Sequence, residues 1–137
     1  MPRFWFFILI ISLNGCDVFY IKRLDFQRPS EFSFVSRYEA NKAEIISAVE
    51  NYALANNMSC SVKPSVLLDC SLQPKDVVVF EDANGVSICL FMLGISWEAG
   101  DFNQFTELIK NLIHEKLRYA TLNNFSEKDD CNNIPMP

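Results

Sequence analysis

The segment VVVFEDANGVSICLFML, residues 77–93, predicts two strands joined by a tight turn, and the rest of the fold can be built around this hairpin. Asn84-Gly85 between two apolar runs is typical of a two-residue hairpin loop of type I′, which needs positive φ at both positions. Side chains alternate along a strand, so this loop predicts two faces. One face holds Val77, Val79, Leu90 and Met92, and the other holds Val78, Phe80, Phe91 and Leu93.

Both faces of this hairpin are apolar, whereas an antiparallel sheet with one solvated side shows a polar face. The aromatic rings of Phe80 and Phe91 bury the larger area, which favours packing of their face against helices. We then expect residues 17–35 or a binding partner to cover the aliphatic face. The predicted partner face consists of Val77, Val79, Leu90, Met92 and Trp97. For Trp97 the alternative interpretation is a core residue just before a helix.

Helices are predicted on both sides of the strands. Ser36 and Glu39 form a capping box for a helix that ends near Ala55, before Asn56-Asn57. A second helix, with a wide apolar stripe, is expected from Asp101 to about Leu122. Between the first helix and the hairpin, residues 65–72 alternate like a half-buried strand bracketed by prolines, and residues 59–62 form a shorter candidate strand.

This order of elements predicts an α+β fold, a two-layer sandwich with the order helix–antiparallel β-meander–helix. We expect a single domain over residues 36–125, with both helices on one face of the sheet. Residues 16–35 would be a tether or a packed N-terminal segment, with a short strand near Val18–Phe26. Residues 126–137 are a polar tail that Cys131 would fix to the domain.

Composition excludes several classes of protein. The chain has 137 residues, is 50% apolar and 21% charged, and carries a net charge of −5. An apolar content this high is not that of a disordered chain. The excess of acidic residues also argues against a basic surface for nucleic acid, so we expect no nucleic-acid partner.

The N-terminus carries the features of an export signal. Arg3 precedes FWFFILIISL, residues 4–13, an apolar run interrupted only by Ser12. A membrane-spanning helix needs about 20 apolar residues, whereas about ten suit the apolar core of a secretory signal peptide. The alternatives are an uncleaved anchor and an ordinary signal peptide with an incidental cysteine.

Leu13-Asn14-Gly15-Cys16 follows this run and resembles the lipobox of bacterial lipoprotein precursors. Asn14 departs from the small residue usual at its position. The resemblance implies removal of residues 1–15 and attachment of a lipid to Cys16. It predicts a lipid-anchored protein of the bacterial envelope that faces the periplasm. Asp17 resembles the signal that retains enteric lipoproteins in the inner membrane, and the outer membrane is the alternative.

Four cysteines remain after Cys16: Cys60, Cys70, Cys89 and Cys131. Four cysteines allow three disulfide connectivities. We favour Cys60–Cys70, which closes a short turn, and Cys89–Cys131, which would attach the tail. The alternative is four buried free thiols. The spacing of zinc ligands is absent from the sequence, and we expect neither a metal nor another cofactor.

No catalytic motif is visible, and we expect no catalytic residues. His114 is the single histidine; it is interpreted as structural or exposed, with a Cys89–His114 nucleophile pair as the alternative. The neighbouring carboxylates Glu81 and Asp82 point to opposite faces of a strand and do not form a catalytic pair.

The sequence therefore predicts a membrane-anchored lipoprotein that binds another protein and is not an enzyme. An immunity-type protein and an accessory subunit of an envelope complex are two versions of this hypothesis. A small envelope hydrolase and a module that binds a lipid or small ligand are the alternatives.

Overall fold

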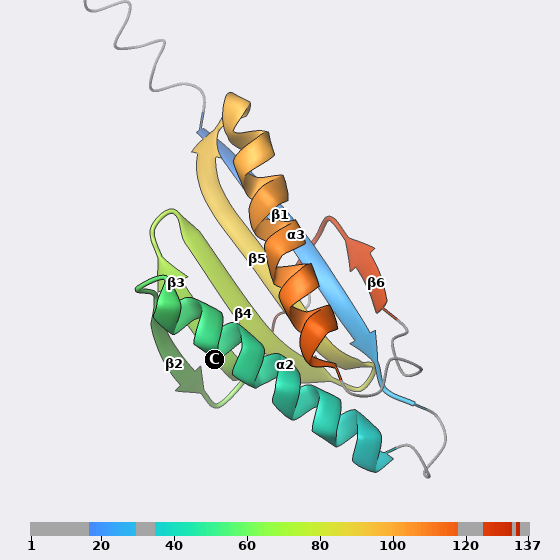
Figure 1. The fold of residues 1–137 in the computed structure, drawn as a ribbon. Coiled ribbons are helices and arrows are strands. Elements are labelled where there is room, and N and C mark those ends of the chain that lie inside the picture. The colour runs from blue at the N-terminus through green and yellow to red at the C-terminus, as the bar shows by residue number, and fades with distance from the viewer. Residues whose placement is uncertain (1–16, 30–34, 118–124, 133, 135–137) are drawn as a thin grey trace, which may run out of the picture.

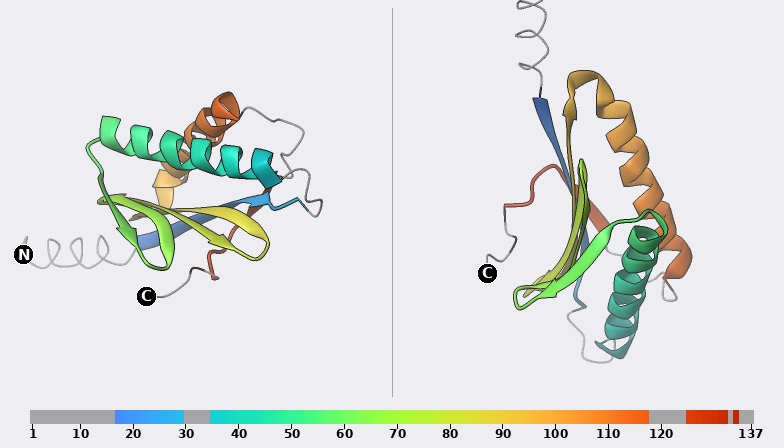
Figure 2. Two further views of the ribbon diagram at one scale, coloured as in Figure 1. Left: turned by 90° about the horizontal axis from the view of Figure 1, so that it is seen from below. Right: turned by 90° about the vertical axis from the view of Figure 1, so that its left-hand side faces the viewer.

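The computed structural model describes residues 17–29, 35–117, 125–132 and 134. Along this part of the chain the elements are β1 (Asp17–Gln27), α2 (Val35–Ala55), β2 (Ser59–Lys63), β3 (Val66–Leu72), β4 (Lys75–Asp82), β5 (Gly85–Ile95), the 3-10 turn η2 (Ser96–Glu98), α3 (Ala99–Lys116) and β6 (Phe125–Lys128). The strands form one antiparallel sheet in the order β2-β3-β4-β5-β1-β6 (Figure 1). Both helices cover one face of this sheet, and the C-terminal segment lies on the other (Figure 2). The predicted α+β sandwich is confirmed.

The β4–β5 hairpin forms as predicted, but its loop is Ala83-Asn84 and not Asn84-Gly85. Asp82 pairs with Gly85, and Val79 therefore pairs with Ile88. The Asp82 carboxylate accepts the N–H groups of Asn84 at 2.8 Å and Gly85 at 3.2 Å, which fixes this turn. The register differs from the predicted one by two residues. Because side chains alternate with period two, each still lies on the predicted face.

The assignment of the two faces to their neighbours is wrong. Val77, Val79, Leu90 and Met92 pack beneath the helices in the main core, whereas Val78 and Phe80 lie on the opposite face. The helices bring bulky aromatic groups to this core, since α3 supplies Phe102 and Phe105. The hairpin contributes aliphatic side chains to the same cluster. The predicted partner face is thus largely the core of the protein.

The N-terminal segment belongs to the sheet and does not cover it. β1 extends the predicted strand near Val18–Phe26 to 11 residues and pairs with β5 along its whole length, from Asp17 opposite Ile95 to Gln27 opposite Gly85. Leu24 and Phe26 enter the core. The aliphatic face of the hairpin is therefore covered by the helices, and the expectation that residues 17–35 cover it is wrong.

The first helix is close to its prediction. α2 begins at Val35, so Ser36 lies in its first turn and not before it. It ends at Ala55, and Asn57 takes the left-handed conformation with φ of 61°. This confirms the expected end of the helix at Asn56-Asn57.

α3 starts at Ala99 and ends at Lys116, about six residues before the predicted Leu122. Leu117 is extended, with φ of −69° and ψ of 120°, and its side chain packs against the core. The helix ends where the backbone becomes extended at Leu117, whose N–H donates to the carbonyl of Ile113 at 3.0 Å. Residues 118–124 lie outside the described part of the chain.

The beginning of the predicted tail forms a strand. β6 pairs with β1, with Lys128 opposite Arg23 and Ser126 opposite Asp25. The predicted domain boundary between residues 125 and 126 falls inside this strand. The sheet therefore brings together residues from both ends of the described chain.

Candidate functional site

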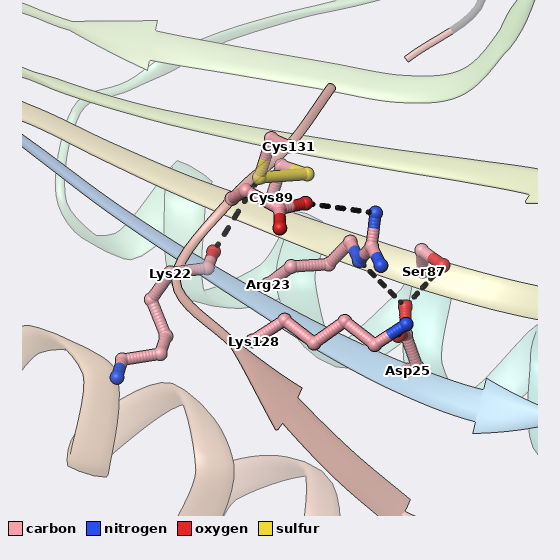
Figure 3. The surroundings of a disulfide bond; sticks show 8 residues. Lys22, Arg23, Asp25, Ser87, Cys89, Lys128 and Cys131 are labelled. Atoms are coloured by element: carbon pink, nitrogen blue, oxygen red, sulfur yellow. Dashed lines mark hydrogen bonds and ion pairs between the residues drawn. A yellow bond between two sulfur atoms is a disulfide. The ribbon is translucent and has the colours of Figure 1, made fainter. Parts of the chain in front are cut away.

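The helix-free face of the sheet is partly covered by the C-terminal segment, which a disulfide holds in place. Cys89 of β5 is bonded to Cys131, and Cys131 and Ile134 pack against the cluster that contains Val78 and Phe80. Figure 3 shows the sulfur pair above β1 and β5. The predicted Cys89–Cys131 pairing is thus confirmed.

The second disulfide lies at the other edge of the sheet. Cys60 of β2 is bonded to Cys70 of β3, and the two residues are direct partners in the strand register. This predicted pairing is confirmed as well. The alternative of four free thiols is wrong.

Polar side chains from three strands meet beside the Cys89–Cys131 disulfide (Figure 3). The hydroxyl of Ser87 donates a hydrogen bond to Oδ1 of Asp25 at 2.6 Å. Nε of Arg23 lies 3.2 Å from the same oxygen, and Nζ of Lys128 lies 3.8 Å from Oδ2 of Asp25. Asp25 stands opposite Ser87 in the β1–β5 register, so the strand pairing itself assembles the cluster.

Arg23 is buried, with only 6% of its surface exposed. Two carboxylates compensate its charge: that of Asp25 and that of Asp130, whose Oδ1 lies 3.4 Å from Nη1. Nε has no aligned hydrogen-bond partner among the described residues, so its contact with Asp25 is an ion pair without a well-directed hydrogen bond. Because Arg23 is buried and the two carboxylates are partly exposed, removing Asp25 would leave the charge of the arginine less compensated, which is destabilising.

A pocket of about 590 Å³ opens beside this cluster. Its walls come from the end of β1, the β4–β5 turn and β6. Most of the lining residues are polar: Arg23, Asp25, Gln27, Asp82, Asn84, Ser87, Ser126 and Lys128. The volume lies within the range of small-ligand sites, but such sites are lined mainly by apolar side chains. The pocket instead offers hydrogen-bond donors, acceptors and charges of both signs.

The rim of the pocket at the β4–β5 turn is closely packed. Gly85 has a φ of +144°, and a Cβ atom at this position would lie 2.1 Å from the carbonyl oxygen of Phe26. The N–H of Arg28 donates to the carbonyl of Asn84 at 2.7 Å. The turn is therefore fixed against the end of β1, which preforms this side of the pocket.

A second ionic cluster ties α2 to the same hairpin. The hydroxyl of Tyr38 donates to Glu81 at 2.5 Å, and Arg28 and Lys42 lie 3.1 and 3.4 Å from the same carboxylate. Partial burial opposes ionisation of Glu81, but the Tyr38 hydrogen bond and the two cations outweigh it and lower the pKa of Glu81. Burial, followed by the hydrogen bond to Glu81, raises the pKa of Tyr38. This cluster holds the helix layer to the strand that borders the pocket.

Two carboxyl groups, Asp69 of β3 and Asp76 of β4, interact near the other edge of the sheet. Burial, then the hydrogen bond and charge of Asp69, raise the pKa of Asp76 to about 7. Asp69 is paired with Lys63 at 2.9 Å. Burial and the neighbouring Asp69 carboxylate therefore disfavour the charged form of Asp76.

The residues that the sequence predicts for a partner face do not form one exposed surface. Val77, Val79, Leu90 and Met92 are buried under the helices, so they do not form a partner face. Trp97 is 71% exposed in η2, so its interpretation as a core residue is wrong. Cys16 lies outside the described residues.

The alternative Cys89–His114 nucleophile pair is also wrong. Cys89 is bonded to Cys131 and lies on the helix-free face, in the cluster with Phe80. His114 is an exposed residue of α3, which covers the opposite face. Among the described residues, no three His, Cys, Asp or Glu side chains gather in a way that would hold a metal ion.

Sequence reasoning missed the pocket residues. Arg23, Asp25 and Gln27 alternate with Leu24 and Phe26, which is the period of a strand with one polar face. This alternation was a signal for a polar surface on β1. It could not identify Ser87 or Lys128 as neighbours, because they come from strands 60 and more residues further along the chain.

Neither helix within the described residues combines the length and apolar character needed to cross a membrane. No protein-family model, curated protein or solved structure matches this chain.

Proposed function

We propose that the protein is a small lipid-anchored protein of a bacterial envelope that binds another protein and is not an enzyme. The proposed anchor is Cys16, the cysteine of the lipobox-like sequence Leu13-Asn14-Gly15-Cys16. Two acyl chains are enough to hold a protein stably on a membrane. Asp17 favours retention in the inner membrane, facing the periplasm.

The disulfides support this location. Disulfides persist in oxidising compartments such as the periplasm and are rare in the cytosol. Cys60–Cys70 and Cys89–Cys131 use four of the five cysteines. Cys16 is left over, as a lipidated cysteine would be.

The observation that carries the binding proposal is the position of the pocket relative to the anchor. β1 starts at Asp17, next to Cys16, and lines the pocket from Arg23 to Gln27. A strand rises roughly 3.3 Å per residue, so the pocket begins about 20 Å from Asp17 and ends about 33 Å from it. A protein held at Cys16 would therefore present the pocket at its far end, accessible to a partner in the periplasm.

The lining of the pocket suits a protein surface. Charged and polar groups of both signs provide orientation and specificity at protein interfaces. The ion pairs of Arg23 and the fixed turn at Gly85 preorganise this surface, which lowers the entropic cost of binding. A partner such as a toxin or a subunit of an envelope complex would bind here without chemical change.

Site-specific photo-crosslinking in cells tests this proposal. A photoreactive residue at Asn84, on the pocket rim, should give a crosslinked adduct of one defined mass. The same residue at Asn111, an exposed position of α3, is the matched control and should give none. Absence of an adduct at Asn84, or the same adduct at both positions, would contradict the proposal.

A small polar ligand is the second candidate, because the pocket volume of about 590 Å³ fits one. Native mass spectrometry of the purified protein would detect a ligand that remains bound. The variant Lys128→Glu, which reverses the charge in the lining, should release it. An unliganded mass for the wild-type protein would count against this candidate.

A further inference from the structure

Exposed apolar side chains gather at the end of the molecule where β1 begins. This end, which we call the anchor end, comprises the start of β1, the end of β5, η2 and the β3–β4 turn (Figure 1). The described chain exposes eight large apolar residues. Four of them lie at this end: Phe19 and Leu93 on the helix-free face, Trp97 in η2, and Leu72 as the last residue of β3.

The strand register places three of these residues close to Asp17. Phe19 lies directly opposite Leu93, and the two are 58% and 47% exposed. Asp17 lies opposite Ile95, and Trp97 follows two residues later in η2. The N–H of Leu93 donates to the carbonyl of Pro74 at 3.0 Å, which brings the β3–β4 turn beside them.

The distance to the proposed anchor identifies what covers this end. Consecutive Cα atoms are about 3.8 Å apart, so an acylated Cys16 would lie one residue from the start of the sheet. No linker separates the two, and the anchor end could not be held away from the bilayer. This inference therefore rests on the lipid anchor of the proposed function.

The chemistry of the exposed residues fits a lipid surface. Tryptophan favours the membrane–water interface, because its ring is apolar and its N–H is polar. Burial of apolar side chains such as Phe19 and Leu93 in the interfacial region is favourable. The carboxylate of Glu98, beside Trp97, accepts the N–H of Ile95 at 3.1 Å and is thereby tied to the strand end.

We infer that the anchor end rests in the headgroup region of the membrane, with Phe19, Leu93 and Trp97 as its lipid contacts. The protein then stands with β1 rising from the membrane and its pocket facing away. The lipid and the apolar end together fix this orientation, whereas a lipidated chain on a flexible tether would leave the domain free to rotate.

Tryptophan fluorescence of the acylated protein tests this inference. The sequence contains two tryptophans, Trp5 and Trp97. Trp5 would leave with residues 1–15, and the variant Trp5→Phe also removes it from any uncleaved precursor, so Trp97 is the single probe. The acylated protein would be reconstituted in phosphatidylcholine vesicles with and without brominated acyl chains, since bromine quenches nearby tryptophan. We expect the emission of Trp97 to shift to shorter wavelength and to lose intensity in the brominated vesicles.

Two further variants in the same background control for the site of contact. Leu93→Glu, at the anchor end, should reduce the quenching of Trp97. Leu108→Glu, on α3, is matched in exposure at 48% and should leave the quenching unchanged. Thermal melting of both variants verifies that they fold. If either does not fold, the quenching of Trp97 in the protein that keeps Leu93 still tests the inference.

The mass of the N-terminal peptide separates the two proposals. Acylated Cys16 with unquenched Trp97 would overturn the membrane contact and leave the proposed anchor intact. An N-terminal peptide without acyl chains would overturn both, because the membrane would no longer lie beside Asp17. Acylation together with quenching that Leu93→Glu weakens is the expected result.

Discussion

The substitution Asp76→Asn should change how the stability of the protein depends on pH. Oδ1 of Asp76 is buried and has no hydrogen-bond partner among the described residues. Burial first, and then the neighbouring Asp69, raise the pKa of Asp76 from 3.8 to about 7. Asparagine has nearly the same shape as the protonated aspartic acid but cannot ionise, so it removes the titration and keeps the packing.

The sign of the effect follows from proton binding. The native state binds the Asp76 proton up to about pH 7, whereas the unfolded chain releases it near the ordinary pKa of 3.8. Between these two pH values the native state holds more protons, and its free energy of unfolding therefore falls as pH rises. Asp76 contributes this stability fully at low pH and has lost it above about pH 7.

The magnitude follows from the size of the pKa change. One pKa unit corresponds to about 1.4 kcal/mol, but Asp76 is only half-buried, and solvent screening reduces the effect. We expect the fall to amount to on the order of 1–2 kcal/mol after that reduction. The pH range from 5 to 8 covers somewhat more than half of this fall, so Asp76→Asn should gain about 1 kcal/mol relative to the wild type over that range.

Urea denaturation at pH 5 and pH 8 measures this difference directly. Glu50→Gln, an exposed position on α2, serves as the control, and its difference from the wild type should be the same at both pH values. If the difference between Asp76→Asn and the wild type also stays constant, the pKa of Asp76 is not raised as described.

Three other substitutions test the packing of the sheet. Val79→Glu places a charge at a fully buried position under the helices, and circular dichroism should show no cooperative melting; a folded variant would place Val79 outside the core. The double variant Cys89→Ala with Cys131→Ala removes the disulfide between these two residues. For a loop of this length the chain-entropy model predicts a loss of about 4 kcal/mol in the free energy of unfolding, measured by urea denaturation. An unchanged midpoint would mean that other contacts hold the tail. Gly85→Ala should lower the free energy of unfolding by about 1–3 kcal/mol, because φ of +144° strains any residue with a Cβ, and this Cβ would meet the carbonyl oxygen of Phe26 on β1. Unchanged thermal melting would refute this close approach of β1 to the turn.

Local sequence patterns were sufficient for several elements. The alternation over residues 77–93 assigns each side chain of the β4–β5 hairpin to its face, even though the loop lies one residue earlier than predicted. Asn57 marks the end of α2 because asparagine tolerates the left-handed conformation. The even number of cysteines after Cys16, together with the tail position of Cys131, was enough to favour the observed pairing.

The side of the hairpin that meets the helices could not be predicted in the same way. Both faces of the hairpin are apolar, so its periodicity does not distinguish them. The choice depends on the side chains that the helices bring to the core, among them Phe102 and Phe105 of α3, which share one cluster with Val77 and Val79. That arrangement is a property of packing in three dimensions.

The pocket also depends on long-range pairing. Arg23 and Asp25 from β1 meet Ser87 from β5 and Lys128 from β6 only because both strands flank β1. β6 is short and polar, and no local signal distinguishes it from an irregular tail. Such a site becomes visible once the strand order is known.

The proposed membrane anchorage at Cys16 is tested by mass spectrometry of the N-terminus of the protein purified from cell membranes. We expect a mature chain that begins at Cys16 and carries acyl chains, and a Cys16→Ser variant that remains an unacylated precursor. A wild-type chain that retains Met1, or one that is cut elsewhere and bears no lipid, would contradict it.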